Sequence, residues 1–170
     1  MAGIIKVNQY QDFNGNTLFT SDGNGNLTTQ EINYPAFDTK YGSSQTVSSA
    51  TWTVLNYSTE NFDTNNCYDN STNYRFTPTV AGKYFLRAIV SYDLTPQSLV
   101  ISIFKNGSIV PESYRRLSDS ATLSYPTIDT HVMVEANGST DYFDARVFVG
   151  GTPTASRASE GGFSGFRIGS

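Results

Sequence analysis

The sequence is poor in the residues from which disulfides, zinc sites and basic surfaces are built. Its 170 residues include one cysteine, Cys67, and one histidine, His131, so neither an intrachain disulfide nor a Cys/His zinc cage can form. Eleven lysines and arginines stand against 15 aspartates and glutamates, which gives a net charge of −4, and the only adjacent cations are Arg115 and Arg116. This acidic balance indicates a protein that does not bind nucleic acid.

Long apolar runs and simple repeats are also missing. No run approaches the roughly 20 apolar residues that cross a membrane, and residues 1–8 lack the apolar core of a secretory signal peptide. Neither heptads nor a Gly-X-Y repeat occurs. We therefore expect no membrane insertion and synthesis in a cytoplasm. In that reducing compartment Cys67, which lies in a polar context, is expected to be a free and dispensable thiol.

What is abundant points to β-structure. Aromatic residues make up 14% of the chain, with 11 Tyr and 11 Phe, among many Thr, Ser, Asn and Gly residues. The Asn106-Gly107 pair between two apolar runs predicts a tight hairpin. Short strands separated by turn residues are typical of a β-sandwich. Strands are expected near residues 50–56, 73–77, 83–93, 98–105, 108–114, 128–136, 141–149 and 163–168.

Residues 1–46 have a different character from the rest. Turn sequences at 14–16 and 22–26 separate short strand-like pieces at 4–10, 17–20 and 27–33, which contain too few apolar residues for a core. The polar residues 42–46, which follow Pro35, predict a linker. We expect an N-terminal hairpin segment, 1–46, that packs on the rest of the chain, on its own copies or on another protein, and a β-domain over 47–170.

The alternation within the long strands carries information about assembly. In residues 84–92 one face is apolar throughout, while Phe85 and Ile89 flank Arg87 on the other face. In residues 142–149 Phe148 likewise lies opposite the main apolar face. A single sandwich buries only the inner faces of its sheets, so the additional aromatic residues predict a subunit interface.

Residues 76–90, with the sequence FTPTVAGKYFLRAIV, resemble the signature of the C1q-like domain, the trimeric jelly roll that this family shares with tumour necrosis factor. The elements IFKNG at 103–107 and GFSGFRI at 162–168 are similar to the family's hairpin and closing strand. The resemblance covers about residues 48–170. It implies an all-β fold, a C1q/TNF-like jelly-roll sandwich of two antiparallel sheets that forms a homotrimer.

Two groups of residues follow from the alternation and the resemblance together. The core and trimer contacts are expected to include Phe76, Tyr84, Leu86, Val90, Phe143, Phe148, Phe163 and Phe166. Some C1q-like trimers hold calcium near the three-fold axis through loop carboxylates. The resemblance therefore leaves calcium open here, and no other cofactor is expected. The carboxylates available to it are Asp119, Asp129, Asp141 and Asp144.

The N-terminal segment replaces the stalk of other C1q-like proteins. Its sequence TSDGNGNLT at 20–28 resembles the N-terminal segments of virion appendage proteins of tailed bacteriophages. This resemblance implies a viral structural protein, such as a short fibre, knob or tail or capsid decoration, that is located in the virion. Its N-terminal segment would bind other virion proteins, and its C-terminal domain would be available to a host-surface glycan or protein. The alternatives are a free-standing carbohydrate- or protein-binding lectin-like module and, third, a hydrolase.

Few residues have the pattern of a catalytic site. His131 alternates with apolar residues as an ordinary strand residue does, and no Ser or Cys lies in a nucleophile motif. Nothing in the spacing of the aspartates fixes the distance between two carboxylates, so no catalytic residue is assigned and we expect a protein that is not an enzyme. Loops 57–75 and 114–127 are rich in residues that can bind sugars, and the candidates are Tyr57, Tyr68, Tyr74, Tyr114 and Tyr125.

Overall fold

The computed structural model describes residues 8–29, 34–92, 98–118, 125–150, 154–156 and 161–169. The chain divides into two compact units, Met1–Asn33 and Tyr34–Ser170. Among the described residues no helix has the length and apolarity needed to cross a membrane.

The first unit is a three-stranded antiparallel meander made of β1 (Gln9–Gln11), β2 (Thr17–Ser21) and β3 (Leu27–Thr29). Both of its turns follow the pattern Asp-x-Asn-Gly-Asn, at 12–16 and at 22–26. In each turn the carboxylate of the aspartate accepts hydrogen bonds from the backbone N–H groups two and four residues later. Gly15 and Gly25 take the positive φ angles that the turns require, +82° and +93°.

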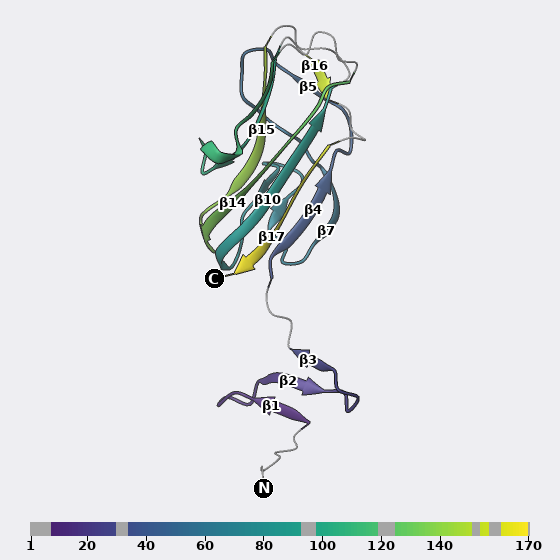
Figure 1. Ribbon diagram of the computed structural model, residues 1–170, viewed down its shortest axis with the longest axis vertical. Coiled ribbons are helices and arrows are strands. Elements are labelled where there is room, and N and C mark those ends of the chain that lie inside the picture. The colour runs from purple at the N-terminus through teal and green to yellow at the C-terminus, as the bar shows by residue number, and fades with distance from the viewer. Residues whose placement is uncertain are drawn as a thin grey trace. The chain divides into compact units, whose positions relative to one another are not determined.

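The second unit is a sandwich of two antiparallel sheets (Figure 1). The first sheet has five strands. In spatial order they are β14 (Thr127–Asn137), β10 (Ala81–Ser91), β17 (Gly162–Gly169), β4 (Ala36–Lys40) and β7 (Thr59–Asp63).

The other sheet has seven strands, with β11 and β15 at its centre. Its main path runs through β12 (Ser108–Ile109), β11 (Ser98–Lys105), β15 (Phe143–Gly150), β9 (Arg75–Phe76) and β8 (Tyr68–Asp69). In addition β13 (Arg115–Ser118) pairs with β11, and β6 (Thr53–Val54) pairs with β15. A 3-10 turn at Pro111–Ser113 precedes β13. A separate two-stranded ribbon joins β5 (Gln45–Val47) to β16 (Thr154–Ser156).

Alternation places the apolar side chains of both sheets between them. Tyr84, Leu86, Ala88 and Val90 of β10 are completely buried, as are the inward residues of β11 and β15. Each large side chain of this kind stabilises the fold by about 1.5–3 kcal/mol relative to an exposed one. Around Phe37 the aromatic rings of three other segments gather at centroid distances of 4.5–5.1 Å, namely Tyr68, Phe76 and Phe163.

The domain boundary expected near residue 46 lies inside the sandwich. Strand β4 is hydrogen-bonded between β17 and β7, and Phe37, Tyr41 and Val47 belong to the core. The linker was predicted from Pro35 and the polar residues 42–46, but Gln45–Val47 form β5, and β4 precedes them with outward Asp38 and Lys40 alternating with buried residues. The division in the structure therefore falls 13 residues earlier, between Asn33 and Tyr34.

The long strands lie within a few residues of their predicted ranges, and the Asn106-Gly107 hairpin joins β11 to β12. Both hairpin residues have positive φ angles, +52° and +81°. The prediction of one strand over 108–114 is wrong, because only Ser108–Ile109 pairs as a strand and a 3-10 turn follows at Pro111–Ser113. The strands that were not predicted are β4, β5, β7, β8, β13 and β16. The expected strand at 4–10, most of the one at 27–33 and the turn at 95–97 lie wholly or partly outside the described residues.

The position of β4 predicts how the chain tolerates truncation. A fragment that starts at Tyr34 keeps the whole sandwich and should unfold in one cooperative transition. A fragment that starts at Gln45 loses β4 and Phe37, whose removal as a core phenylalanine alone costs about 3–5 kcal/mol. We expect this shorter fragment to be unfolded or strongly destabilised in urea denaturation followed by circular dichroism. Equal stability of the two fragments would contradict the assignment of β4 to the sandwich.

Candidate functional site

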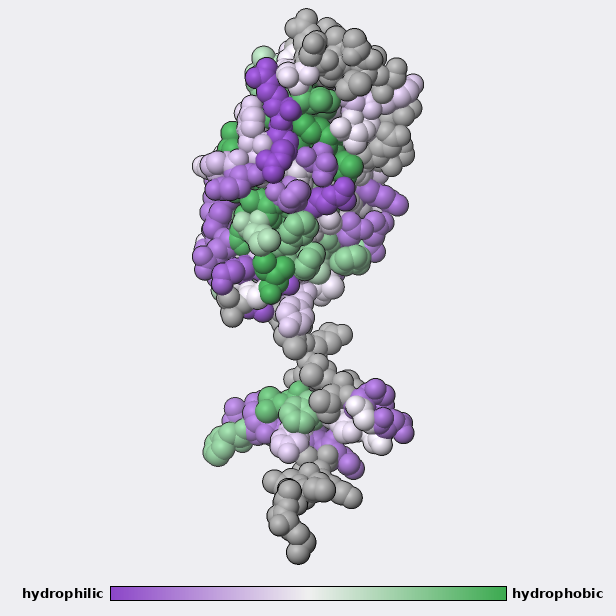
Figure 2. Space-filling model, viewed as in Figure 1, coloured by the Kyte–Doolittle hydropathy of each residue, from purple (hydrophilic) through white to green (hydrophobic). Residues whose placement is uncertain are grey.

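The outward face of the five-stranded sheet carries a row of apolar side chains. The strand register places Phe85 of β10 opposite Met133 of β14 on one side and opposite Phe166 of β17 on the other, and Phe166 in turn pairs with Ala36 of β4. Met133 is 72% exposed and Phe166 is 50% exposed. With Ile168 of β17, also largely exposed, these residues form what we call the outer apolar face. Figure 2 shows apolar side chains gathered over this sheet, with polar ones around them.

Charged and polar groups border the outer apolar face. Two residues along β10, Arg87 lies opposite His131, and its guanidinium is 3.8 Å from the Asp129 carboxylate. The His131 ring stacks against Phe85 with 6.0 Å between centroids. His131 is therefore an exposed strand residue whose ring contacts the outer apolar face.

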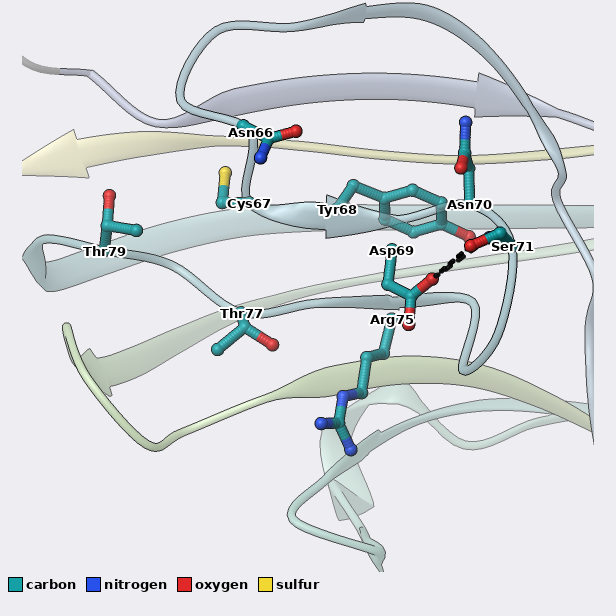
Figure 3. A pocket seen from close by; sticks show the side chains of 9 residues that line it. All are labelled: Asn66, Cys67, Tyr68, Asp69, Asn70, Ser71, Arg75, Thr77 and Thr79. Carbon is teal, nitrogen blue, oxygen red and sulfur yellow. Dashed lines mark hydrogen bonds between the residues drawn. The ribbon is translucent and has the colours of Figure 1, made fainter.

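A second feature is an open pocket of about 510 Å³ next to β8 and β9 (Figure 3). It is lined by Asn66, Cys67, Tyr68, Asp69, Asn70, Ser71, Arg75, Thr77 and Thr79. Arg75 extends away from Asp69 in Figure 3, and its guanidinium lies 4.4 Å from the centroid of the Tyr142 ring. The pocket therefore does not contain an ion pair between these two charged residues.

The Asp69 carboxylate is occupied by its own turn. It accepts hydrogen bonds from the backbone N–H groups of Ser71, Thr72 and Asn73 at 2.9–3.1 Å, and from the Asn73 side-chain amide at 2.8 Å. These bonds, that of Thr72 above all, hold the pKa of Asp69 well below its usual range. The group is therefore a structural cap for residues 69–73 and is poorly suited to act as a general acid or base.

Cys67 is buried, contrary to the expectation of a polar, exposed position. It belongs to the core cluster, and its Sγ lies 3.3 Å from a carboxylate oxygen of Asp63. Burial, reinforced by the charge of Asp63, raises the pKa of the thiol far above its ordinary value, so the thiolate is scarce at neutral pH. The thiol is free, as expected, but it is part of the core and is a poor nucleophile.

The eight residues expected in the core or at a trimer contact separate into three positions. Phe76, Tyr84, Leu86, Val90, Phe143 and Phe163 lie between the sheets with no exposed surface. Phe166 lies on the outer apolar face. Phe148 lies on the outward face of the other sheet, where its ring is 5.8 Å from that of Trp52.

Two of the five tyrosines expected in ligand-binding loops belong to the core instead. Tyr57 is completely buried, and its hydroxyl donates to the carbonyl oxygen of Ile89 at 2.8 Å. Tyr68 is nearly as buried and stacks against Phe37. The loop composition gave no indication of this, because the sequence does not show that Tyr57, between β6 and β7, and Tyr68, in the two-residue strand β8, face inward. Tyr74 is half-buried, whereas Tyr114 and Tyr125 are exposed.

The described aspartates that were considered as calcium ligands each have a different cationic neighbour. Asp129 lies beside Arg87, Asp144 forms an ion pair with Arg146, and Asp141 forms one with Lys105 at 2.9 Å. The pKa of Asp141 is lowered, chiefly by the side-chain amide of Asn106 and then by Lys105. Within the described residues no three His, Cys, Asp or Glu side chains are grouped as a metal site, and Asp119 lies outside those residues.

Sequence reasoning did not identify Met133 and Ala36 as surface residues that continue the row of Phe85 and Phe166. Met133 lies in a strand whose inward residues are also apolar, so its outward position depends on knowing which residues are inside. The sequence signal for this surface was the alternation around Phe85, which indicated that one strand has apolar residues on both faces. The alternation could not show which side chains of β14 and β17 lie beside Phe85.

The depressed pKa of Asp69 predicts a dependence of stability on pH. Folding lowers the pKa of Asp69 below its value in the unfolded chain, which is near 4. The ionised carboxylate therefore stabilises the folded protein at pH values above about 4, and this contribution is lost as the pH falls further. Asp69→Asn should lower the free energy of unfolding at pH 7 by about 1 kcal/mol, as for a lost structural hydrogen bond. The difference between the two proteins should shrink below about pH 4. Urea unfolding at a series of pH values measures this difference in the free energy of unfolding. A difference that stays constant with pH would refute the role of Asp69.

Comparison with known proteins supports the fold. No family model matches the sequence, and no curated protein sequence matches it. Among solved structures, murine APRIL at pH 8.5 matches with a TM-score of 0.59 and 7% identity, over 79% of this chain and 99% of that one. The Eiger TNF from S. frugiperda matches with a TM-score of 0.51 and 9% identity, over 79% of this chain and 91% of that one. At such low identity the likeness concerns the fold alone: the chain is an all-β protein with a TNF-like jelly roll, as its sequence predicted.

Proposed function

We propose that this protein is a homotrimeric, non-enzymatic structural protein of a bacteriophage particle, a short fibre, knob or decoration appendage. In this proposal the jelly roll trimerises through the outer apolar face. The N-terminal segment attaches the protein to other virion proteins, and the sandwich remains available to contact the host surface. The observation that carries the proposal is the apolar row across β14, β10, β17 and β4.

This row has the properties of a protein contact. Scattered apolar side chains are common on surfaces, but here Met133, Phe85 and Phe166 are adjacent on three paired strands. Covering one exposed phenylalanine contributes about 2 kcal/mol, and a cyclic assembly repeats that contribution at every interface. Arg87 and Asp129, an exposed ion pair within the chain, add both signs of charge at the border of this row. The C1q-like signature in residues 76–90 favours three copies.

The state of the reactive side chains supports a role without catalysis. Asp69 is bound within its turn, Cys67 is buried, and Asp129, Asp141 and Asp144 each have a cationic neighbour. Within the described part of the chain these groups do not form a nucleophile with a base, or two free carboxylates that face one another. A structural protein needs neither arrangement.

The N-terminal unit has the properties of an attachment segment. Among the described residues its edge strands β1 and β3 each pair on one side only, and an unpaired edge is a template for pairing with another chain. Phe13 is completely exposed, and Tyr10 and Leu18 are about half exposed. Because three short strands are marginally stable alone, this unit gains most from a partner that covers these residues.

A free-standing carbohydrate- or protein-binding module is the alternative function, and it predicts that purified particles lack the protein.

A single substitution tests the trimer. At micromolar concentration the native protein should sediment at three times its chain mass of 18.6 kDa. Phe166→Arg places a charge in the middle of the outer apolar face and should give a folded monomer. Ile109→Arg is the matched control, because Ile109 is exposed on the other sheet, and it should leave the trimer intact. A native monomer, or a trimer that survives Phe166→Arg, would overturn the assignment of this face.

The role in a particle has its own test. Peptide mass spectrometry of purified particles from the phage that encodes this chain should detect the protein at a defined copy number. Particles grown without the full-length protein should take it up from solution, but should not take up the folded fragment that starts at Tyr34. Absence from purified particles would refute the virion role. Uptake of the fragment would refute attachment through the N-terminal unit.

A further inference from the structure

A second surface, on the outward face of the seven-stranded sheet, contains a hollow of about 290 Å³. It lies on the sheet opposite to the one that carries the outer apolar face. Its lining is mostly aromatic or aliphatic with one cation. The lining residues are Trp52, Ser98, Val100, Ile109, Tyr114, Arg116 and Phe148.

The strand register builds this hollow from distant parts of the chain. Val100 of β11 pairs with Phe148 of β15 on one side and with Arg116 of β13 on the other, so the three side chains form one row. Trp52, just before β6, lies over this row. Its ring centroid is 5.1 Å from that of Phe104, 5.8 Å from Phe148 and 6.5 Å from Tyr114.

The base of the hollow is buried, and the residues at its sides are partly exposed. Val100 lines the hollow and is nearly fully buried, so it forms the base, and Phe104, whose ring contacts Trp52, is equally buried. Tyr114 is 42% exposed and Ile109 is 39% exposed, while Trp52 is half-buried. Aromatic rings therefore border the hollow and still face solvent. A cluster that served only to pack the sheet would bury these rings as completely as it buries Phe104.

Arg116 differs from the neighbouring arginines. Arg146 pairs with Asp144 and lies over the Phe104 ring, and Arg115 donates to the carbonyl oxygens of Glu112 and Tyr114. Arg116 is exposed, and among the described residues it has neither a hydrogen-bond acceptor nor an ion-pair partner. In a chain of net charge −4, an unpaired guanidinium beside aromatic rings is a site where an anionic group can bind.

We propose that this hollow binds a single sugar ring that bears a carboxylate. The apolar C–H face of a sugar packs on the rings of Trp52 and Tyr114, which combine a large apolar surface with a polar edge. The carboxylate accepts a pair of hydrogen bonds from the Arg116 guanidinium, a geometry to which Arg is suited. The hydroxyl of Ser98 is available to a hydroxyl of the ring. The volume of the hollow, about 290 Å³, is sufficient for one sugar ring.

This inference names a ligand class for the host-surface contact in the proposed function and rests on that role for its biology. The binding itself requires neither the trimer nor the particle. A failure to bind sugar by a protein that is trimeric and present in particles would therefore overturn this inference alone.

The only tryptophan of the chain, Trp52, reports directly on the hollow. The full-length protein is titrated with methyl glucuronide, methyl galacturonide and methyl N-acetylneuraminate glycoside, and with methyl glucoside as the neutral match of the first. At least one acidic sugar should change the Trp52 emission in a saturable way, with an affinity about tenfold or more above that of glucoside. No saturable response to any of the three, or an equal response to glucoside, would overturn the proposal.

Variants identify the groups responsible. Arg116→Gln should abolish the preference for the acidic sugar, and Tyr114→Ala should weaken acidic and neutral sugars alike. Arg115→Gln is the matched control. It removes the same charge from the next residue, which alternation places on the other side of β13, and it should bind like the native protein. Equal weakening by Arg115→Gln and Arg116→Gln would attribute the effect to net charge and refute the assigned site.

Discussion

Strand β10 has apolar side chains on both of its faces, and the rest of the molecule is arranged around that constraint. Inward, Tyr84 and Leu86 pack in the core between the sheets, where they are completely buried. Outward, Phe85 lies between its neighbours on β14 and β17, with the Phe166 ring at 5.6 Å. Intramolecular packing covers the first face entirely and the second only in part, and the proposed contact between copies rests on this second face. An assembly of copies satisfies both faces with one sequence.

The two outward faces of the sandwich differ in chemistry. On the five-stranded sheet the apolar side chains are aligned, continuous over neighbouring strands and bordered by both signs of charge, which suits a flat contact between copies. On the seven-stranded sheet aromatic side chains border a hollow, and the Arg116 guanidinium beside them has no hydrogen-bond acceptor or ion-pair partner among the described residues. That arrangement suits a small anionic ligand. A trimer built on the first face would leave the second free, so assembly and ligand binding need not compete.

Much of the sandwich could be predicted, because strict alternation in a long strand shows both where the strand runs and which of its residues face inward. The strands around Leu86, Ile101 and Val147 are of this kind, and so is the hairpin at Asn106-Gly107. Strand β4 was not predicted, because it is short and its outward Asp38 and Lys40 interrupt the apolar pattern. Tyr57 and Tyr68 were placed in loops because local sequence does not show whether a tyrosine in a short segment faces inward. The hollow near Trp52 could not be predicted at all, since only the register brings residues 52, 100, 116 and 148 together.

Oxidation of Met133 tests most directly whether copies of the chain cover the outer apolar face. Met133 is one of two methionines, and in a single chain it is largely exposed, so hydrogen peroxide should convert it readily to the sulfoxide. Peptide mass spectrometry separates it from Met1. We predict that Met133 in the native protein is protected, and that Phe166→Arg or unfolding restores the oxidation rate of an exposed methionine. Oxidation of Met133 in the native protein as fast as in the unfolded chain would contradict the account.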